Sequence, residues 1–150
     1  TTRMALTASR TGLFRGACAE YCGTSHALMN FMVEVMPKEG FTNWLDRQSR
    51  DASEPNTEIA RRGRRVFVEN GCGACHAIRG LNARGAIGPD LTHVGSRYSL
   101  GAGVLTNDLP ALERWIARPG RIKPEVHMPA FGMLPEEDQR ALAAYLKGLE

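Results

Sequence analysis

Long hydrophobic runs are absent from this sequence of 150 residues. A transmembrane helix needs about 18 or more consecutive apolar residues. The best stretch, ALMNFMVEVM, is short and is interrupted by Asn30 and Glu34. We therefore expect no membrane span within these residues. Since the sequence starts at Thr1 without a recognisable signal peptide, we also expect that an upstream part is missing.

Lysine is scarce, and charge of either sign is weak. The basic residues are 16 Arg and 3 Lys, set against 16 acidic residues, for a net charge of +3. Such a mixed and nearly balanced surface argues against nucleic-acid binding. The densest basic stretch, ARRGRR at 60–65, is interpreted as the solvated face of a helix, with a docking patch for an acidic partner as the alternative.

Cysteine occurs in two short clusters only. Cys18 and Cys22 form a C-x-x-x-C pair, and Cys72, Cys75 and His76 form a C-x-x-C-H motif. Four cysteines in an exported chain would usually indicate two disulfides. Pairs this close in sequence, each beside further soft ligands, instead favour cofactor binding. A disulfide between Cys18 and Cys22 remains an alternative for the first cluster.

Residues 1–35 have the alternating pattern of β-strands broken by turns. Three segments carry it: TRMALTA, RTGLFRG and FMVEVM. Pro37 is expected to end the third strand, and a short helix is expected from Glu39. That helix would place its apolar residues on one side: Phe41, Trp44 and Leu45.

The polar segment DASEPN, residues 51–56, contains a proline and has no periodicity. We interpret it as a linker, so that residues 1–50 and 57–150 form separate domains. The second domain is predicted to hold three helices, connected by loops rich in Gly and Pro. The longest of these loops is expected to run from Ala77 to Ser99.

Each of the three helices has a recognisable start. The first is capped by Thr57, the second by Asp108 with Pro110 in its first turn, and the third begins at Pro135 and runs to the end of the chain. The second is expected to end at Pro119. The apolar face of the first helix is predicted to be Ile59, Gly63, Val66 and Phe67, and that of the third Leu142, Tyr145, Leu146 and Leu149.

The CGACH motif is the attachment signature of c-type haem. Thiols of Cys72 and Cys75 within one turn reach the two vinyl groups of a porphyrin, and His76 falls under the iron as an axial ligand. A zinc site would want a second ligand pair of similar spacing, which residues 57–150 do not offer. A dithiol redox motif would lie in a βαβ pattern. The segments around CGACH are instead predicted to be helical, which argues against that motif.

A haem iron held in this way needs a sixth ligand. Met128, in HMPAF, is the best choice because a Met/His pair raises the reduction potential and suits electron transfer. His127 and Met133 remain rivals on the residues alone.

From about Thr57 to Glu150 the sequence resembles class I cytochromes c. The resemblance is carried by the first helix, CGACH, GPDL, MPAF and the final helix with ALAAYL. It implies a mainly α cytochrome c fold in which the first and last helices cross at Gly63 and Tyr145. It also implies Met128 as the sixth ligand and a hydrogen bond from His76 to the carbonyl of Pro89.

The first cluster, CAEYCGTSHALM, has the soft ligands of an electron-transferring copper site. It resembles the C-x-E-x-C-G-x-x-H-x-x-M loop of the binuclear CuA centre in the cytochrome c oxidase subunit II family. The resemblance implies that Cys18 and Cys22 bridge two coppers. His26, Met29 and the backbone carbonyl of Glu20 would complete the ligands on this loop.

The family also needs a second histidine upstream, and no His precedes Cys18. His93 and His127 belong to the haem domain. A cupredoxin-like β-sandwich needs roughly seven strands over about 100 residues, far more than residues 1–36 supply. We therefore expect residues 1–50 to be the C-terminal part of a cupredoxin-like domain, with an incomplete copper site in this chain alone.

A CuA loop followed by a cytochrome c domain resembles oxidase subunit II proteins with a fused cytochrome. The resemblance implies electron transfer in aerobic respiration, from haem to CuA, in a haem-copper terminal oxidase. The expected partners are the oxidase catalytic subunit, an upstream electron donor, and the membrane through missing upstream segments. The implied location is the periplasmic, outer face of the bacterial cytoplasmic membrane.

The chain itself shows no nucleophile, general base or substrate pocket, so any enzyme activity would belong to the complex. Two other functions remain open. One is a free-standing soluble c-type cytochrome whose N-terminal extension is structural or a docking segment. The other is a haem-based sensor or peroxidase that opens its site by releasing Met128.

Overall fold

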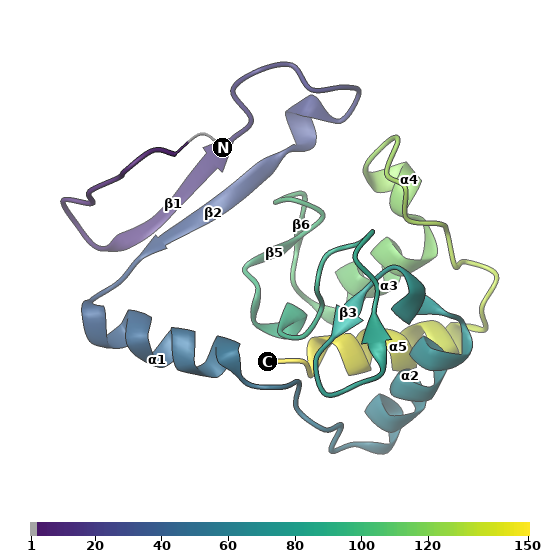
Figure 1. Cartoon of the computed structure of the whole chain (residues 1–150). Helices are drawn as coiled ribbons and strands as arrows, with labels where there is room; N and C mark the ends of the chain where they lie inside the picture. Colours follow the sequence, from purple (N-terminus) through teal and green to yellow (C-terminus); the bar gives the residue numbers. More distant parts are fainter. Residues whose placement is uncertain (1–2) are drawn as a thin grey trace.

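The computed structural model describes residues 3–150 (Figure 1). A β-hairpin and one helix lie on one side, and the remaining helices with two small sheets lie on the other. Helices make up 39% of the chain and β-hairpins occur in both parts, so the chain is mixed rather than mainly α. The predicted helical character holds for its C-terminal part.

The hairpin consists of β1 (Gly12–Ala17) and β2 (Asn30–Val35), paired antiparallel with Gly16 opposite Phe31. The Phe31 ring lies over Gly16, so that an added Cβ would lie 2.2 Å from the ring and the ring would have to move. Two of the three predicted strands are thus confirmed. The remaining predicted strand, TRMALTA, begins outside the described residues, and its part from residue 3 to 8 is not a strand. Its alternation is weak, and no described strand pairs with it.

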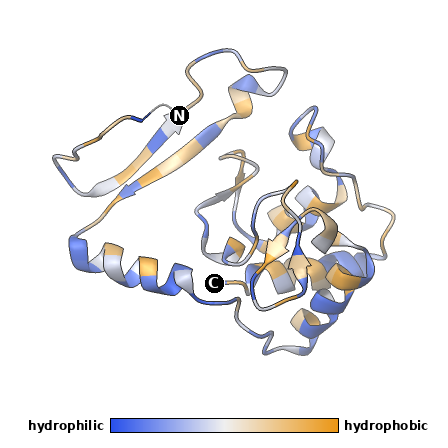
Figure 2. Cartoon of the chain, viewed as in Figure 1, coloured by the Kyte–Doolittle hydropathy of each residue, from blue (hydrophilic) through white to orange (hydrophobic). Residues whose placement is uncertain are grey.

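Pro37 ends the hairpin, as predicted, and precedes α1 (Lys38–Ser49). The predicted apolar residues of α1 lie on one side but are not buried: Phe41 is 49% exposed, Trp44 39% and Leu45 51%. In Figure 2, α1 mixes hydrophobic and hydrophilic residues along its length, whereas hydrophobic residues gather where the other long helices meet. The core therefore lies in the C-terminal part.

Three helices form that core: α2 (Glu58–Glu69), α3 (Leu109–Ala117) and α5 (Glu136–Lys147). The predicted apolar stripe of the last helix is buried: Leu142, Tyr145 and Leu146 on α5, and Leu149 just beyond its end, are at most 7% exposed. On α2 the prediction of Ile59 is wrong, because Ile59 is 48% exposed and Ala60 is buried in its place. Ala60, Gly63 and Phe67 follow the i, i+3, i+7 spacing of one helix face. α5 ends at Lys147 rather than at the end of the chain.

The crossing of α2 and α5 is built around Gly63. An added Cβ at Gly63 would lie 1.9 Å from the carbonyl oxygen of Ala141 and 2.7 Å from Cβ of Tyr145. The two backbones are therefore in direct contact, as the resemblance implied. One turn along, the rings of Phe67 and Tyr145 meet edge to face with centroids 6.0 Å apart.

The predicted helix starts are also present. Thr57 accepts a hydrogen bond from the amide of Ala60 at 3.2 Å, and Asp108 accepts one from Ala111 at 2.8 Å. α3 ends before Pro119, which opens the short helix α4 (Pro119–Ile122). These caps satisfy amides that the first helical turn leaves without partners.

The segment predicted as a long loop contains short regular elements. β3 (Ala77–Ile78) pairs with β4 (Ala83–Arg84), and β5 (Ser99–Leu100) pairs with β6 (Leu105–Thr106). A 3-10 turn covers Val94–Ser96. Two-residue strands leave no periodic signal, which is why the sequence did not reveal them. None of the helices between residues 3 and 150 combines the length and hydrophobicity that a membrane crossing requires.

The cap of α3 leads to a testable pH dependence. Hydrogen bonds from the Thr106 hydroxyl and the Ala111 amide lower the pKa of Asp108 below its ordinary value. The stability that this carboxylate contributes is therefore present above its ordinary pKa and is lost as the pH falls through the lowered pKa. We expect Asp108→Asn, which keeps an acceptor oxygen, to unfold near the wild-type denaturant midpoint at neutral pH.

On acidification the same variant should lose less stability than the wild type, because it lacks the titrating group. Denaturant titrations at neutral and acidic pH check this, with Asp108→Ala as the variant that loses the cap at every pH. Equal acid sensitivity of the wild type and Asp108→Asn would contradict the assignment.

Candidate functional site

The first ligand cluster lies on the loop between β1 and β2, residues 18–29, which we call the copper loop. Cys18 directly follows β1 and Met29 directly precedes β2. The amide of Cys18 donates to the carbonyl of Met29 at 2.9 Å and extends the strand pairing by one step. The hairpin thereby brings the two ends of the loop together.

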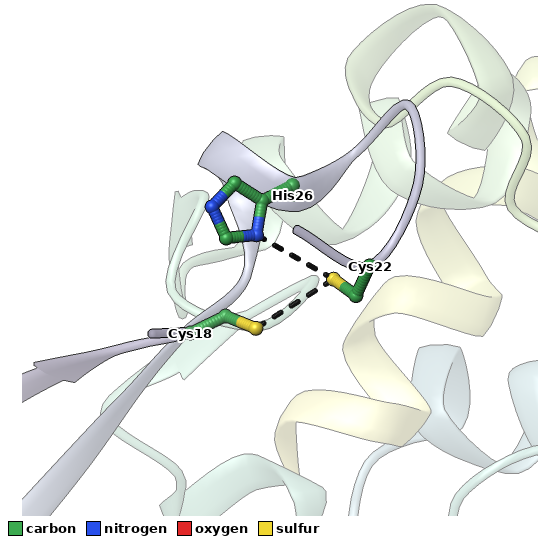
Figure 3. Close-up of side chains that lie close together, drawn as sticks. All are labelled: Cys18, Cys22 and His26. Carbon is green, nitrogen blue, oxygen red and sulfur yellow. Dashed lines mark hydrogen bonds between the residues drawn. The ribbon is translucent and has the colours of Figure 1, made fainter. Parts of the chain in front are cut away.

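Within this loop the ligand atoms converge (Figure 3). The two sulfurs of Cys18 and Cys22 are 3.6 Å apart, and Nδ1 of His26 lies 3.7 Å from Cys22 Sγ. These three ligand atoms all lie within 4.8 Å of one another. Sδ of Met29 is 3.7 Å from Cys22 Sγ, and the carbonyl of Glu20 is 3.1 Å from Cys18 Sγ. The structure therefore gathers all five ligands that the resemblance implied.

The cysteines of the loop are free thiols. Their separation of 3.6 Å exceeds the bonded S–S distance of about 2.05 Å, so the alternative of a disulfide is not the arrangement seen here. The pKa of the Cys22 thiol is raised, first by its contact with Cys18 and then by burial, while the charge of Lys123 acts in the opposite direction. Thiols bind a metal ion only after losing their protons.

The second ligand cluster follows α2 directly. Asn70 caps that helix, and Gly71, at a φ of 69°, turns the chain into a 3-10 turn over Cys72–Ala74. The amide of His76 donates to the carbonyl of Cys72 at 3.0 Å. This turn presents both thiols and the imidazole from one short segment. Burial raises the pKa of the Cys72 thiol, which keeps it in its neutral form.

The imidazole of His76 is held by two neighbours. Its Nδ1 donates to the carbonyl of Pro89 at 2.7 Å. An added Cβ at Gly88 would lie 2.5 Å from its Cε1, so only glycine leaves room for the ring. Because Nδ1 carries the proton, Nε2 is the nitrogen with a free lone pair for a metal.

The three residues considered for the sixth position differ in exposure. Met128 is partly buried, whereas Met133 is 76% exposed and His127 is also exposed. A thioether that binds iron has to face the interior next to the porphyrin, so the exposures favour Met128. All three follow α4 on the connection to α5.

Residues 60–150 match the family model of cytochrome c. This match covers more than half of the chain. The chain belongs to the cytochrome c family.

Proteins named cytochrome c oxidase subunit 2 are similar to the chain beyond this domain. The one from Alkalihalophilus pseudofirmus is 41% identical over 150 residues, which is 100% of this chain and 43% of that protein. The one from Bacillus subtilis is 34% identical over 142 residues, or 92% of this chain and 40% of that protein. A shorter match, 43% identical over 44 residues, covers 29% of this chain and 19% of the protein from Branchiostoma floridae.

The chain is thus a homologue of cytochrome c oxidase subunit 2 along its whole length. The chain spans about two fifths of the length of the bacterial relatives it matches. The family implies haem c as the cofactor of the cytochrome c domain. The residues of that domain fit haem c, because two free thiols and an imidazole with an available Nε2 lie on one turn.

Sequence reasoning missed two residues beside the ligands. Gly88 shapes the space for the His76 ring, and its signal was a glycine directly before Pro89 in a loop. Lys123 lies close enough to the copper loop to act on Cys22, although the two are about a hundred residues apart. No local pattern reveals a contact of that kind.

Proposed function

We propose that the cytochrome c domain exchanges single electrons through haem c and passes them to a binuclear copper site on the copper loop of the full-length protein. In this proposal residues 1–50 are the end of a cupredoxin-like copper domain, 51–56 are the linker and 57–150 are the cytochrome c domain. The complete protein would serve a haem-copper terminal oxidase.

Haem c, when bound, supplies a one-electron iron couple. Cys72 and Cys75 would hold it through thioether bonds, and Nε2 of His76 would bind the iron. The hydrogen bond to Pro89 and the close fit against Gly88 keep the imidazole in one orientation. Met128 would also bind the iron, and a thioether ligand favours the reduced state.

A binuclear copper centre supplies a second one-electron couple. Cys18 and Cys22 would hold it as thiolates, together with His26, Met29 and the carbonyl of Glu20. A further imidazole would come from an upstream segment of the full-length protein. The hairpin holds both ends of the loop and thereby brings these ligands together.

The observation that carries the proposal is the convergence of two thiols, an imidazole, a thioether and a backbone carbonyl in the same chain as a cytochrome c domain. Similarity to proteins named cytochrome c oxidase subunit 2 supports it. It follows that the partners would be the oxidase catalytic subunit and an upstream electron donor. The location would be the outer face of the bacterial cytoplasmic membrane.

Metal content and optical spectra of the full-length protein test the proposal. We expect one covalently attached haem with the spectrum of a Met/His-ligated iron, and two coppers for each haem. Cys18→Ser combined with Cys22→Ser should remove the copper and leave the haem spectrum unchanged. A full-length protein with haem but without copper would instead support a free-standing cytochrome with an N-terminal docking segment. A high-spin ferric spectrum would support the sensor or peroxidase.

A further inference from the structure

The copper loop and the first residue of β2 contact the cytochrome c domain through one hydrogen bond each. Oγ of Ser25 donates to the carbonyl of Pro124 at 2.5 Å, and the amide of Asn30 donates to the carbonyl of Ala102 at 2.9 Å. On the copper side, Ser25 directly precedes His26 and Asn30 directly follows Met29. In Figure 1 the loop between β1 and β2 faces α4 and the tips of β5 and β6. Each contact is thus one residue away from a copper ligand.

On the cytochrome side, one contact is made by a residue with positive φ and the other lies directly before such a residue. Ala102 has a φ of 64° and Glu125, next to Pro124, has a φ of 60°. Within residues 3–150 these are the non-glycine residues with positive φ. Such conformations persist only where the surrounding structure enforces them, and they gather at functional sites. Pro124 also lies on the connection that leads to Met128.

The surface that receives the copper loop is closely fitted. An added Cβ at Gly103, whose φ is 82°, would lie 2.8 Å from Cβ of Asn30. Two residues earlier in the chain, an added Cβ at Gly101 would lie 2.8 Å from the ring of Trp115. Nζ of Lys123 donates to the carbonyl of Gly101 at 3.5 Å and connects the two receiving loops. The fit leaves no room for a side chain at either glycine.

Further contacts hold the rest of the N-terminal part. Tyr98 donates from its hydroxyl to the carboxylate of Glu34 on β2 at 2.6 Å. At the C-terminal end of α1, Arg79 donates to the carbonyls of Gln48 at 2.5 Å and Arg50 at 2.8 Å. A groove of about 640 Å³ remains between these attachment points. The orientation is therefore defined by separate contacts at the copper loop, near the C-terminal end of β2 and at the C-terminal end of α1.

We propose that the contacts of Ser25 and Asn30 form a docking site within the chain, which holds the copper loop against the cytochrome c domain in the orientation used for electron transfer. This inference rests on the proposed function. A single electron is transferred, so that the reduced haem is oxidised and the copper site is reduced, and no bond is made or broken. Ser25 and Asn30 are positioning residues. A flexible tether alone would supply only an effective concentration on the order of millimolar, without orientation.

Gly103→Ala tests the docking site directly. The added methyl group meets Cβ of Asn30 and imposes a strained φ, so it opposes the docked state. Overpacking of this kind should lower the docked fraction about tenfold or more. Gly120→Ala is the matched control on the same domain, because a Cβ there has no atom within 4 Å. Ser25→Ala removes one contact and should have a smaller effect in the same direction.

Three measurements on the full-length protein separate the outcomes. These are the metal content with the haem spectrum, hydrogen exchange of the Asn30 amide, and the rate of electron transfer to copper after rapid photoreduction of the haem. In Gly103→Ala we expect unchanged cofactors, exchange at Asn30 close to the rate of an unprotected amide, and about tenfold slower electron transfer. Gly120→Ala should match the wild type in all three.

The docking site is refuted if the Asn30 amide is unprotected in the wild type. It is also refuted if Gly103→Ala, holding both cofactors, transfers electrons as fast as Gly120→Ala. Failure of the proposed function differs from both results, since the wild type would then lack copper or haem. Hydrogen exchange at Asn30 reports the contact itself in either case.

Discussion

The double variant Cys72→Ser, Cys75→Ser should carry no covalently attached haem. A serine hydroxyl does not form the thioether bonds that link c-type haem to the chain, so both attachment points are lost together. We expect complete loss of the haem signal from the denatured polypeptide. A denaturing gel stained for haem, together with the mass of the intact chain, checks this.

The matched control is Cys18→Ser, Cys22→Ser, which removes the same number of thiols from the other cluster. It should keep the covalent haem in full, because the copper loop contributes none of the thioether bonds. The two double variants are therefore expected to lose opposite cofactors. Retention of covalent haem in Cys72→Ser, Cys75→Ser would contradict the assignment of the CGACH motif.

A methyl group at Gly63 should destabilise the cytochrome c domain strongly. Replacement of glycine by alanine inside a helix ordinarily stabilises by about 0.5–1 kcal/mol. At Gly63 the new Cβ would lie 1.9 Å from the carbonyl oxygen of Ala141, and a backbone atom cannot rotate away. The helices have to separate, so we expect Gly63→Ala to lower the free energy of unfolding by about 3 kcal/mol or more. Denaturant titration of the haem-loaded protein measures this.

Gly120→Ala again serves as the control, since space around Gly120 is open. There the ordinary helix preference should apply, and the free energy of unfolding should stay within about 1 kcal/mol of the wild-type value. If Gly63→Ala and Gly120→Ala unfold at the same denaturant concentration, α2 and α5 do not meet at Gly63.

Much of the C-terminal fold could be predicted because its signals are local. The caps at Thr57 and Asp108 depend on residues three positions away, and the stripe of α5 repeats with the period of one helix. The wrong prediction that Ile59 is buried also came from relying on local signals. Periodicity alone left two neighbouring faces of α2 available, and the approach of α5 at Gly63 selected the one with Ala60.

The short sheets and the exposure of α1 were beyond the reach of sequence patterns. A two-residue strand such as β3 is defined by its partner rather than by its own residues. Phe41, Trp44 and Leu45 do form one side of α1, but whether that side is buried depends on what packs against it.

By itself, the sequence determined which potential ligands this chain carries and how they are grouped. The copper loop and the CGACH motif are each contained in a dozen residues or fewer, so their spacing already limits the chemistry they support. The tertiary structure decided which part of the cytochrome c domain the copper loop lies against. The contact of Ser25 with Pro124 joins residues 99 positions apart, and the contact of Asn30 with Ala102 depends on a left-handed backbone beside Gly103. Contacts of such long range follow from how the whole chain packs, because no local preference acts across that separation.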